Sequence, residues 1–190
     1  MEKNMIDINV VRKKEDATNQ DIEIEAFVSY VLDLRTLPAA RSALRRAGVE
    51  VTEYRSYGYL ARWWTDKPYL RHPMCAFAGL AATVPGLPQD GMKPVGAMVA
   101  DVVRSGGMTD SGAERKLIVA QTAGLTQLVP LMRSFMQIAS RYPGLGVNYQ
   151  DLYWILRNIE HPDRSVKTRS MQRLLETYYQ SLTPIRLNDN

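Results

Sequence analysis

Residues 111–142 read SGAERKLIVAQTAGLTQLVPLMRSFMQIASRY, and they carry the clearest structural signal of the chain. Ser111 and Glu114 have the spacing of a capping box, in which the two side chains satisfy backbone N–H groups at a helix start. This spacing predicts a helix over residues 112–122. An apolar stripe follows, with the three- and four-residue spacing of one helix face, and its members are Leu125, Leu128, Val129, Met132, Phe135 and Met136. Pro130 falls inside this stripe, so we expect a kink in the second helix or a late start at that point.

The helical period continues toward the C-terminus. Asn148 can cap a helix that ends near Ile159, with Asp151 in a first turn where the helix dipole favours an acid. Residues 161–163 (His-Pro-Asp) are expected to open a last helix, with Pro162 in its first turn. Its apolar stripe consists of Met171, Leu174, Leu175, Tyr178 and Leu182.

Helical patterns also fill the chain toward the N-terminus. They begin at Asp21, where Ile24, Phe27, Val28, Val31 and Leu32 form one apolar face. Further helices are expected over about residues 37–47, 71–84 and 94–104, with Leu37 on the apolar side of the first of these and Pro94 in the first turn of the last. Residues 105–111 contain two glycines and form the best internal boundary. Because no strand-period run of any length appears, the sequence predicts an all-α protein of about eight or nine helices.

Composition excludes several classes of protein. The chain has 190 residues, 45% apolar and 23% charged, which is typical of one large globular domain or two small ones. A single cysteine, Cys75, cannot form an internal disulfide, and two histidines do not suffice for a His-rich metal site. We therefore expect no metal and no cofactor. The polar start is not a signal peptide, and no uncharged run is fit to span a membrane, so we expect a cytoplasmic protein.

The net charge of +4 hides an uneven distribution. Residues 1–33 hold eight acids and four bases, whereas residues 34–190 hold twenty bases and twelve acids, and sixteen of those bases are arginine. Arginine can hold a phosphate with two hydrogen bonds, so the arginine-rich segment 34–190 suggests a polyanionic partner. A high-GC genome, which favours arginine codons, is the alternative explanation.

No catalytic pattern is present in the sequence: it lacks G-x-S-x-G, a phosphate-binding glycine loop, H-E-x-x-H and a Cys–His motif. His72 and His161 are interpreted as residues at helix starts, and Cys75 as a small buried hydrophobe. Trp63 and Trp64 could stack on bases, but their helical setting favours packing in the core. We therefore expect no enzyme activity.

Basic residues gather in three segments instead. Arg41, Arg45 and Arg46 fall within six residues, and Arg115 with Lys116 lies near a helix start, where positive charge is unfavourable against the dipole. A third group, on the last helix, consists of Arg164, Lys167, Arg169 and Arg173. Each group alone is typical of a solvated face, but three arginine-led groups together suggest one shared phosphate-binding track.

The order of these segments resembles the small subunit of the type I-E CRISPR Cascade complex, the CasB family. No single segment is specific, but their order and spacing over about residues 22–182 carry the resemblance. Two departures are the uncharged stretch from Ala120 to Met132 and the acidic N-terminal extension. The matching segments are Arg41-Ser-Ala-Leu-Arg-Arg-Ala47, Tyr59-Leu60, Arg71-His72, Val95-Gly96, Gly112-Ala-Glu-Arg-Lys-Leu117, Leu131-Met-Arg133, Val147-Asn-Tyr-Gln-Asp-Leu152 and the run from Arg169 to Tyr179.

The resemblance implies two packed helical-bundle subdomains, and with the internal boundary given above we expect them to span residues 21–107 and 108–184. Residues 1–20 lack apolar periodicity and are expected to form a flexible tail, and residues 185–190 a short tail. It implies a non-catalytic protein that holds the crRNA–target DNA hybrid and the displaced strand in antiviral defence. The implied partners are the backbone and large Cascade subunits and a second copy of the chain. The nucleic-acid-binding role falls on Arg45, Arg46, Arg71, Arg115, Lys116, Arg133 and Arg169, with Arg41, Lys167 and Arg173 as weaker additions.

Three other functions remain open from the residues alone. A stand-alone helical DNA-binding regulator would need a recognition helix with Asn, Gln and Arg at its start, and none is visible. A protein–protein adaptor would use its arginines on acidic partners. An enzyme would require a convergent polar pocket that the sequence does not reveal.

Overall fold

The computed structural model describes residues 23–186. The tail predicted at 1–20 lies outside the described residues. Within them the regular structure is helical, apart from one isolated bridge between Gln89 and Val147, and the all-α prediction is confirmed. The α-helices span residues 23–34, α2 (Pro38–Leu44), α3 (Tyr57–Leu60), α4 (Arg71–Thr83), α5 (Val95–Arg104), α6 (Asp110–Thr122), α7 (Leu125–Ala139), α8 (Tyr149–Ile159) and α9 (Arg164–Arg186). Three 3-10 helices accompany them: η1 (Glu50–Ser56), η2 (Ala61–Trp63) and η3 (Pro68–Leu70).

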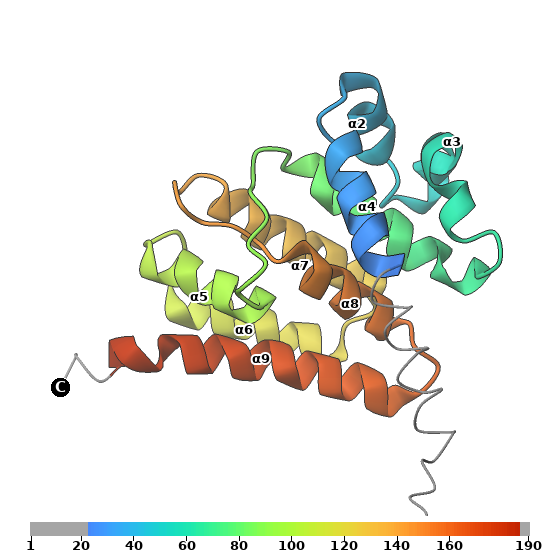
Figure 1. Ribbon diagram of the computed structural model, residues 1–190. Coiled ribbons are helices and arrows are strands. Elements are labelled where there is room, and N and C mark those ends of the chain that lie inside the picture. The colour runs from blue at the N-terminus through green and yellow to red at the C-terminus, as the bar shows by residue number, and fades with distance from the viewer. Residues whose placement is uncertain (1–22, 187–190) are drawn as a thin grey trace, which may run out of the picture.

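The helices form two groups that share one core. In Figure 1, α2, α3 and α4 occupy one end of the molecule, and α9 runs along the opposite side. The long helix α9 packs against α5, α6 and α8, while α4 packs against α7 and α8. This arrangement agrees with two packed helical subdomains. The division near residue 107 stays a prediction, and α5, which that division assigns to the first subdomain, lies along α9 of the second.

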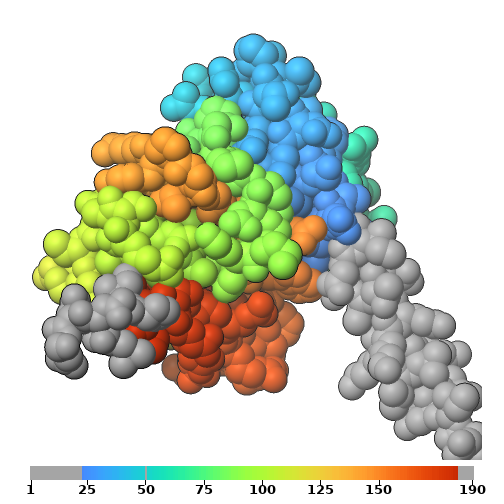
Figure 2. All heavy atoms as spheres, turned by 60° about the vertical axis from the view of Figure 1, so that its left-hand side comes forward, coloured from blue at the N-terminus to red at the C-terminus, as the bar shows by residue number. Residues whose placement is uncertain are grey.

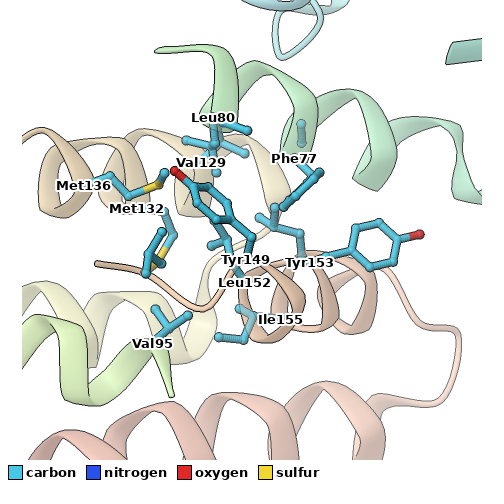
Figure 3. Close-up of a cluster of buried hydrophobic side chains, with 14 of the residues drawn as sticks. Phe77, Leu80, Val95, Val129, Met132, Met136, Tyr149, Leu152, Tyr153 and Ile155 are labelled. Atoms are coloured by element: carbon cyan, nitrogen blue, oxygen red, sulfur yellow. The ribbon is translucent and has the colours of Figure 1, made fainter. Parts of the chain in front are cut away.

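The centre of the core is an aromatic cluster between α4 and α8. The ring of Phe77 lies 5.6 Å from that of Tyr153 and 6.2 Å from that of Tyr149. Phe27 joins them from the first helix, 5.3 Å from Tyr153. Figure 3 shows Tyr149 among apolar side chains of α4 and α7. Edge-to-face pairs of this kind add to the burial of apolar area, so the cluster fixes α8 against α4.

Several helix boundaries differ from the sequence prediction. The α6 helix begins at Asp110, and its cap is Thr109, whose hydroxyl accepts a hydrogen bond from the Gly112 N–H. The prediction that Ser111 caps this helix in a capping box was therefore wrong. Of the two alternatives expected at Pro130, the late start was also wrong, because α7 begins five residues before it, and the kink stays a prediction.

Two expectations for the last helix were also wrong. Pro162 precedes α9, and Asp163 stands just before its start and accepts a hydrogen bond from the Ser165 N–H. Hydrogen bonding from the backbone and the side chain of Ser165 lowers the pKa of Asp163, because it stabilises the carboxylate. The C-terminal tail was predicted to begin at residue 185, but α9 continues to Arg186. In the first half of the chain, Leu37 is 55% exposed and not part of the apolar face of α2, and Pro94 precedes α5 as its cap residue.

The observed cap leads to a stability prediction. Thr109→Ala removes the side-chain acceptor of the Gly112 N–H and is expected to lower the free energy of unfolding by about 1 kcal/mol. Ser111→Ala, two residues later, is the matched control and should change it by less than about 0.5 kcal/mol. Urea unfolding of the three proteins measures both values. A larger loss in the Ser111 variant would reinstate the capping box.

Candidate nucleic-acid interface

The first basic group, here called the α2 cluster, consists of Arg41, Arg45 and Arg46. The α2 helix buries Ala40 and Leu44 against α4, and this packing leaves its arginines on the outer side. Arg45 and Arg46 are exposed, Arg41 is half-buried, and all three line one open pocket. The structure therefore presents three neighbouring arginines, two of them exposed, to which a phosphate backbone could bind.

A second groove, here called the α4/α7 groove, begins where the α2 cluster ends. Ala47, Gly48 and Val49 directly follow Arg46 and line this groove together with Arg133 of α7. The Nη2 atom of Arg133 lies 3.9 Å from the position that a Cβ on Gly48 would take. Its Nε atom is buried and has no hydrogen-bond partner among the described residues. The structure thus brings Arg133 next to the α2 cluster, although 87 residues separate it from Arg46 in the chain.

Arg71 contacts a buried acid beside the same groove. Its Nε atom lies 3.2 Å from Oε1 of Glu53, and His72 Nδ1 lies 3.7 Å from the other carboxylate oxygen. Glu53 is 5% exposed and also accepts a 2.6 Å hydrogen bond from the Tyr57 hydroxyl. That hydrogen bond raises the pKa of Tyr57. Because removing one partner of a buried ion pair leaves an uncompensated charge, Arg71 has a structural role whatever else it binds.

The α6 pair stands apart from both grooves. Arg115 is exposed, and its Nε donates a 3.1 Å hydrogen bond to the Ser111 carbonyl. Lys116 is half-buried. On the outer side of the same helix, Ile118 and Val119 are 52% and 56% exposed. This face of α6 therefore combines positive charge with exposed apolar side chains.

The α9 cations lie along the side of the molecule opposite the α2 cluster (Figures 1 and 2). Lys167 is half-buried, and Arg169 is exposed and bonds to the Ser165 carbonyl at 3.3 Å. Arg173 is also exposed, with its Nη2 3.9 Å from Oδ1 of Asp151. Arg169 and Arg173 line a groove between α8 and α9. The ten predicted residues thus occupy at least three separate surfaces, and one track through all of them stays a prediction.

Sequence reasoning missed two residues of the α8/α9 groove, Trp154 and Asn158. Both lie on the outer side of an otherwise amphipathic helix. A large aromatic residue on the polar face was the signal that could have found them. The aromatic pair singled out from the sequence lies elsewhere: Trp64 is buried, and Trp63 packs edge-to-face on Phe27 at 5.3 Å. Core packing of that pair is confirmed.

The chemistry of Cys75 is that of a core residue. Its thiol is buried and lies 3.9 Å from the Ser56 hydroxyl. Desolvation raises its pKa to about 12. The described part of the chain contains no cluster of three His, Cys, Asp or Glu residues that could hold a metal ion. None of its helices is both long and apolar enough to cross a lipid bilayer.

The raised pKa gives a reactivity prediction. At pH 8 the folded protein should react with iodoacetamide roughly 1,000-fold more slowly than the urea-unfolded chain, because only the thiolate reacts and a thiol with a pKa of about 12 is almost entirely protonated at this pH. With one cysteine in the chain, mass spectrometry of the alkylated protein gives the rate directly. Similar rates in both states would place the thiol at the surface.

Comparison with known proteins identifies relatives of this architecture. The sequence pattern of the family described as CRISPR-associated protein Cse2 matches residues 40–179. No curated protein matches the sequence. A chain of a CRISPR RNA-guided surveillance complex is similar in fold, with a TM-score of 0.66, 17% identity, and coverage of 90% of this chain and 99% of that one. CasB from Thermus thermophilus is similar with a TM-score of 0.62, 17% identity, and coverage of 83% and 97%.

Proposed function

Because the chain belongs to the Cse2 family of CRISPR-associated proteins, we propose that it is the small, non-catalytic subunit of a Cascade effector complex in antiviral defence. In this role it stabilises the crRNA–target DNA hybrid and the displaced strand. The match covers residues 40–179 and includes all ten basic residues predicted to bind nucleic acid. The fold shared with a chain of a surveillance complex supports the same assignment.

One observation carries the nucleic-acid part of the proposal. Of the ten predicted cations, only Arg71 and Arg173 lie within 4.0 Å of a carboxylate among the described residues. For the other eight, led by the α2 cluster, no carboxylate among the described side chains lies within 4.0 Å, which leaves them available to an external anion. In an RNA-guided complex the guide reads the sequence by base pairing, so a protein subunit need only hold the backbone by charge.

The non-catalytic part of the proposal rests on the state of the reactive groups. The pKa of the Cys75 thiol is too high for a nucleophile at neutral pH. His72 lies beside the Arg71–Glu53 pair, and the His161 ring accepts a hydrogen bond from the Asp163 N–H. These groups serve packing and helix starts in the fold, which is consistent with a binding subunit.

The proposed protein partners are the backbone and large subunits of the complex and a second copy of this chain. Two exposed apolar surfaces suit such contacts, because apolar side chains held in water at a surface favour association. One, at η1, includes Val51 and Tyr54, which are 83% and 59% exposed. The other is the Ile118 and Val119 face of α6.

The test is purification of the tagged protein from its native cells. We expect a uniform, guide-sized RNA and several partner proteins to copurify in fixed ratio. A protein that copurifies without RNA but with acidic partners in a salt-sensitive manner would indicate an adaptor. A protein that purifies alone and binds one DNA sequence would indicate a stand-alone regulator, and either result would overturn the Cascade assignment.

A further inference from the structure

The α8/α9 groove has the composition of a site for a planar, negatively charged ligand. It encloses about 370 Å³, within the range of ~300–1,000 Å³ that small-ligand sites occupy. Its floor is apolar, because Ile155 and Leu174 are buried there. Its rim carries an aromatic ring and two cations, Trp154 from α8 and Arg169 and Arg173 from α9.

The indole of Trp154 is held in place from outside the groove. The guanidinium carbon of Arg157, which does not line the groove, lies 4.9 Å from the centre of the Trp154 ring. Such a cation–π contact restrains the side chain of a half-buried tryptophan. Arg157 covers one face of the indole, so a nucleobase in the groove would stack on the opposite face. Stacking tolerates any base because each has a π-face.

The polar groups of the groove differ in their availability. Asp151 is occupied, since its Oδ2 accepts a 2.7 Å hydrogen bond from the Val95 N–H. Thr177 donates to carbonyls of its own helix. The Asn158 side-chain amide makes no hydrogen bond within the described residues. An amide offers donors and an acceptor, so it can satisfy the edge of an unpaired base.

We propose that the α8/α9 groove binds one unpaired nucleotide of a single-stranded nucleic acid, with the base on Trp154, its edge at Asn158 and the backbone phosphate at Arg169 and Arg173. The proposal rests on the proposed function, which provides such a strand: an RNA-guided complex exposes the displaced DNA strand as a single strand. A duplex does not fit this site, because its bases are stacked on one another and their faces are covered. The charge also favours a nucleotide over an apolar peptide, since Arg169 has no carboxylate partner among the described side chains. Arg173 lies 3.9 Å from Asp151 Oδ1, but its side chain is 71% exposed and can also reach a phosphate.

The experiment compares single-stranded and double-stranded DNA binding by the full chain. The probes are a fluorescein-labelled 16-nucleotide oligothymidylate and a 16-base-pair duplex, at low salt and with anisotropy as the readout. Trp154→Leu is expected to weaken single-strand binding by roughly 5- to 100-fold, the range for loss of one stacked base. Binding of the duplex should change by less than about two-fold. Trp154→Phe should restore most of the single-strand binding, because it keeps an aromatic face.

Two controls separate stacking from other effects. Tyr69→Leu removes an aromatic residue that is 66% exposed but lies outside the groove, and it should leave both affinities unchanged. Polyglutamate is added as a competitor, and we expect it not to displace the oligonucleotide. Thermal unfolding of each variant verifies that the fold is intact.

The proposal would be overturned if the unaltered chain did not bind the single strand, or if Trp154→Leu lost equal affinity for both probes. It would also be overturned if Trp154→Phe failed to restore single-strand binding. Displacement of the oligonucleotide by polyglutamate would overturn it too, and would indicate a site for an acidic peptide. None of them contradicts the Cascade assignment, because that assignment is judged by copurification of RNA and subunits. Conversely, if the chain bound the oligonucleotide through Trp154 but purified without guide RNA, the nucleotide site in the groove would be supported and the Cascade assignment would be rejected.

Discussion

Replacing Gly96 by alanine is expected to destabilise the protein by about 3 kcal/mol or more, the upper end of the range for overpacked sites. Gly96 lies where α5 crosses α9, the most extensive helix contact of the described fold. A Cβ at this position would lie 2.1 Å from Thr177 Oγ1, 2.4 Å from the Leu174 carbonyl oxygen and 2.7 Å from the Tyr178 nitrogen. The last two are backbone atoms of α9, so the helices must separate to admit one methyl group.

The measurement is thermal unfolding followed by circular dichroism, where a loss of this size should lower Tm by roughly 6–12 °C. Gly58→Ala is the matched control, because Gly58 also lies in a helix and a Cβ there would meet no atom within 4 Å. Removing the flexibility of glycine should leave that variant neutral or more stable by up to about 1 kcal/mol. If the two variants behaved alike, α5 and α9 would not be in the close contact described.

Local patterns in the sequence were sufficient for most helices. Asn148 caps α8 as predicted, by accepting a hydrogen bond from the Asp151 N–H. Met171, Leu174, Tyr178 and Leu182 are all buried along α9. These features could be predicted because a cap and an apolar stripe depend on residues within a few positions of each other.

Contacts between distant segments could not be predicted in the same way. Nothing next to Gly96 in the sequence shows that α9 crosses it, and Thr109 and Ser111 are equally plausible caps until the helix start is seen. The charge count also included an arginine that does not contribute to the basic surface. Arg35 is 8% exposed and donates hydrogen bonds to the Tyr149 hydroxyl and the Leu87 carbonyl. An arginine that serves the core in this way looks the same in the sequence as one at the surface.

The sequence was sufficient to select the basic residues of the candidate site, but it did not show which of them the fold brings together. The α2 cluster lies together because its members are neighbours in the chain. Arg133 joins it only through the packing of α7 beside Gly48, and Arg71 is drawn to Glu53 by a buried charge that the sequence does not reveal. Trp154 escaped notice because its role depends on the groove that α9 completes.

Charge reversal in the α2 cluster is expected to have the largest functional effect. In a Cascade complex assembled with Arg45→Glu and Arg46→Glu, target DNA affinity should fall by roughly 100-fold or more, since two charge-assisted contacts of about 1.5–3 kcal/mol each are lost. Both side chains are exposed and without a side-chain bond to any described residue, so the fold should be unaffected. Affinity measured at several salt concentrations should also show a slope reduced by about two, one for each lost phosphate contact.

A second double reversal, Arg55→Glu with Arg141→Glu, separates contact from general attraction. Both arginines are exposed and lie outside the proposed set, so this control changes the net charge by the same amount. Long-range attraction depends on total charge and is screened within about 10 Å at 0.1 M salt, whereas a direct phosphate contact depends on position. Equal losses in the two complexes would therefore assign the effect to net charge alone, and an unchanged slope in the α2 variant would remove Arg45 and Arg46 from the interface.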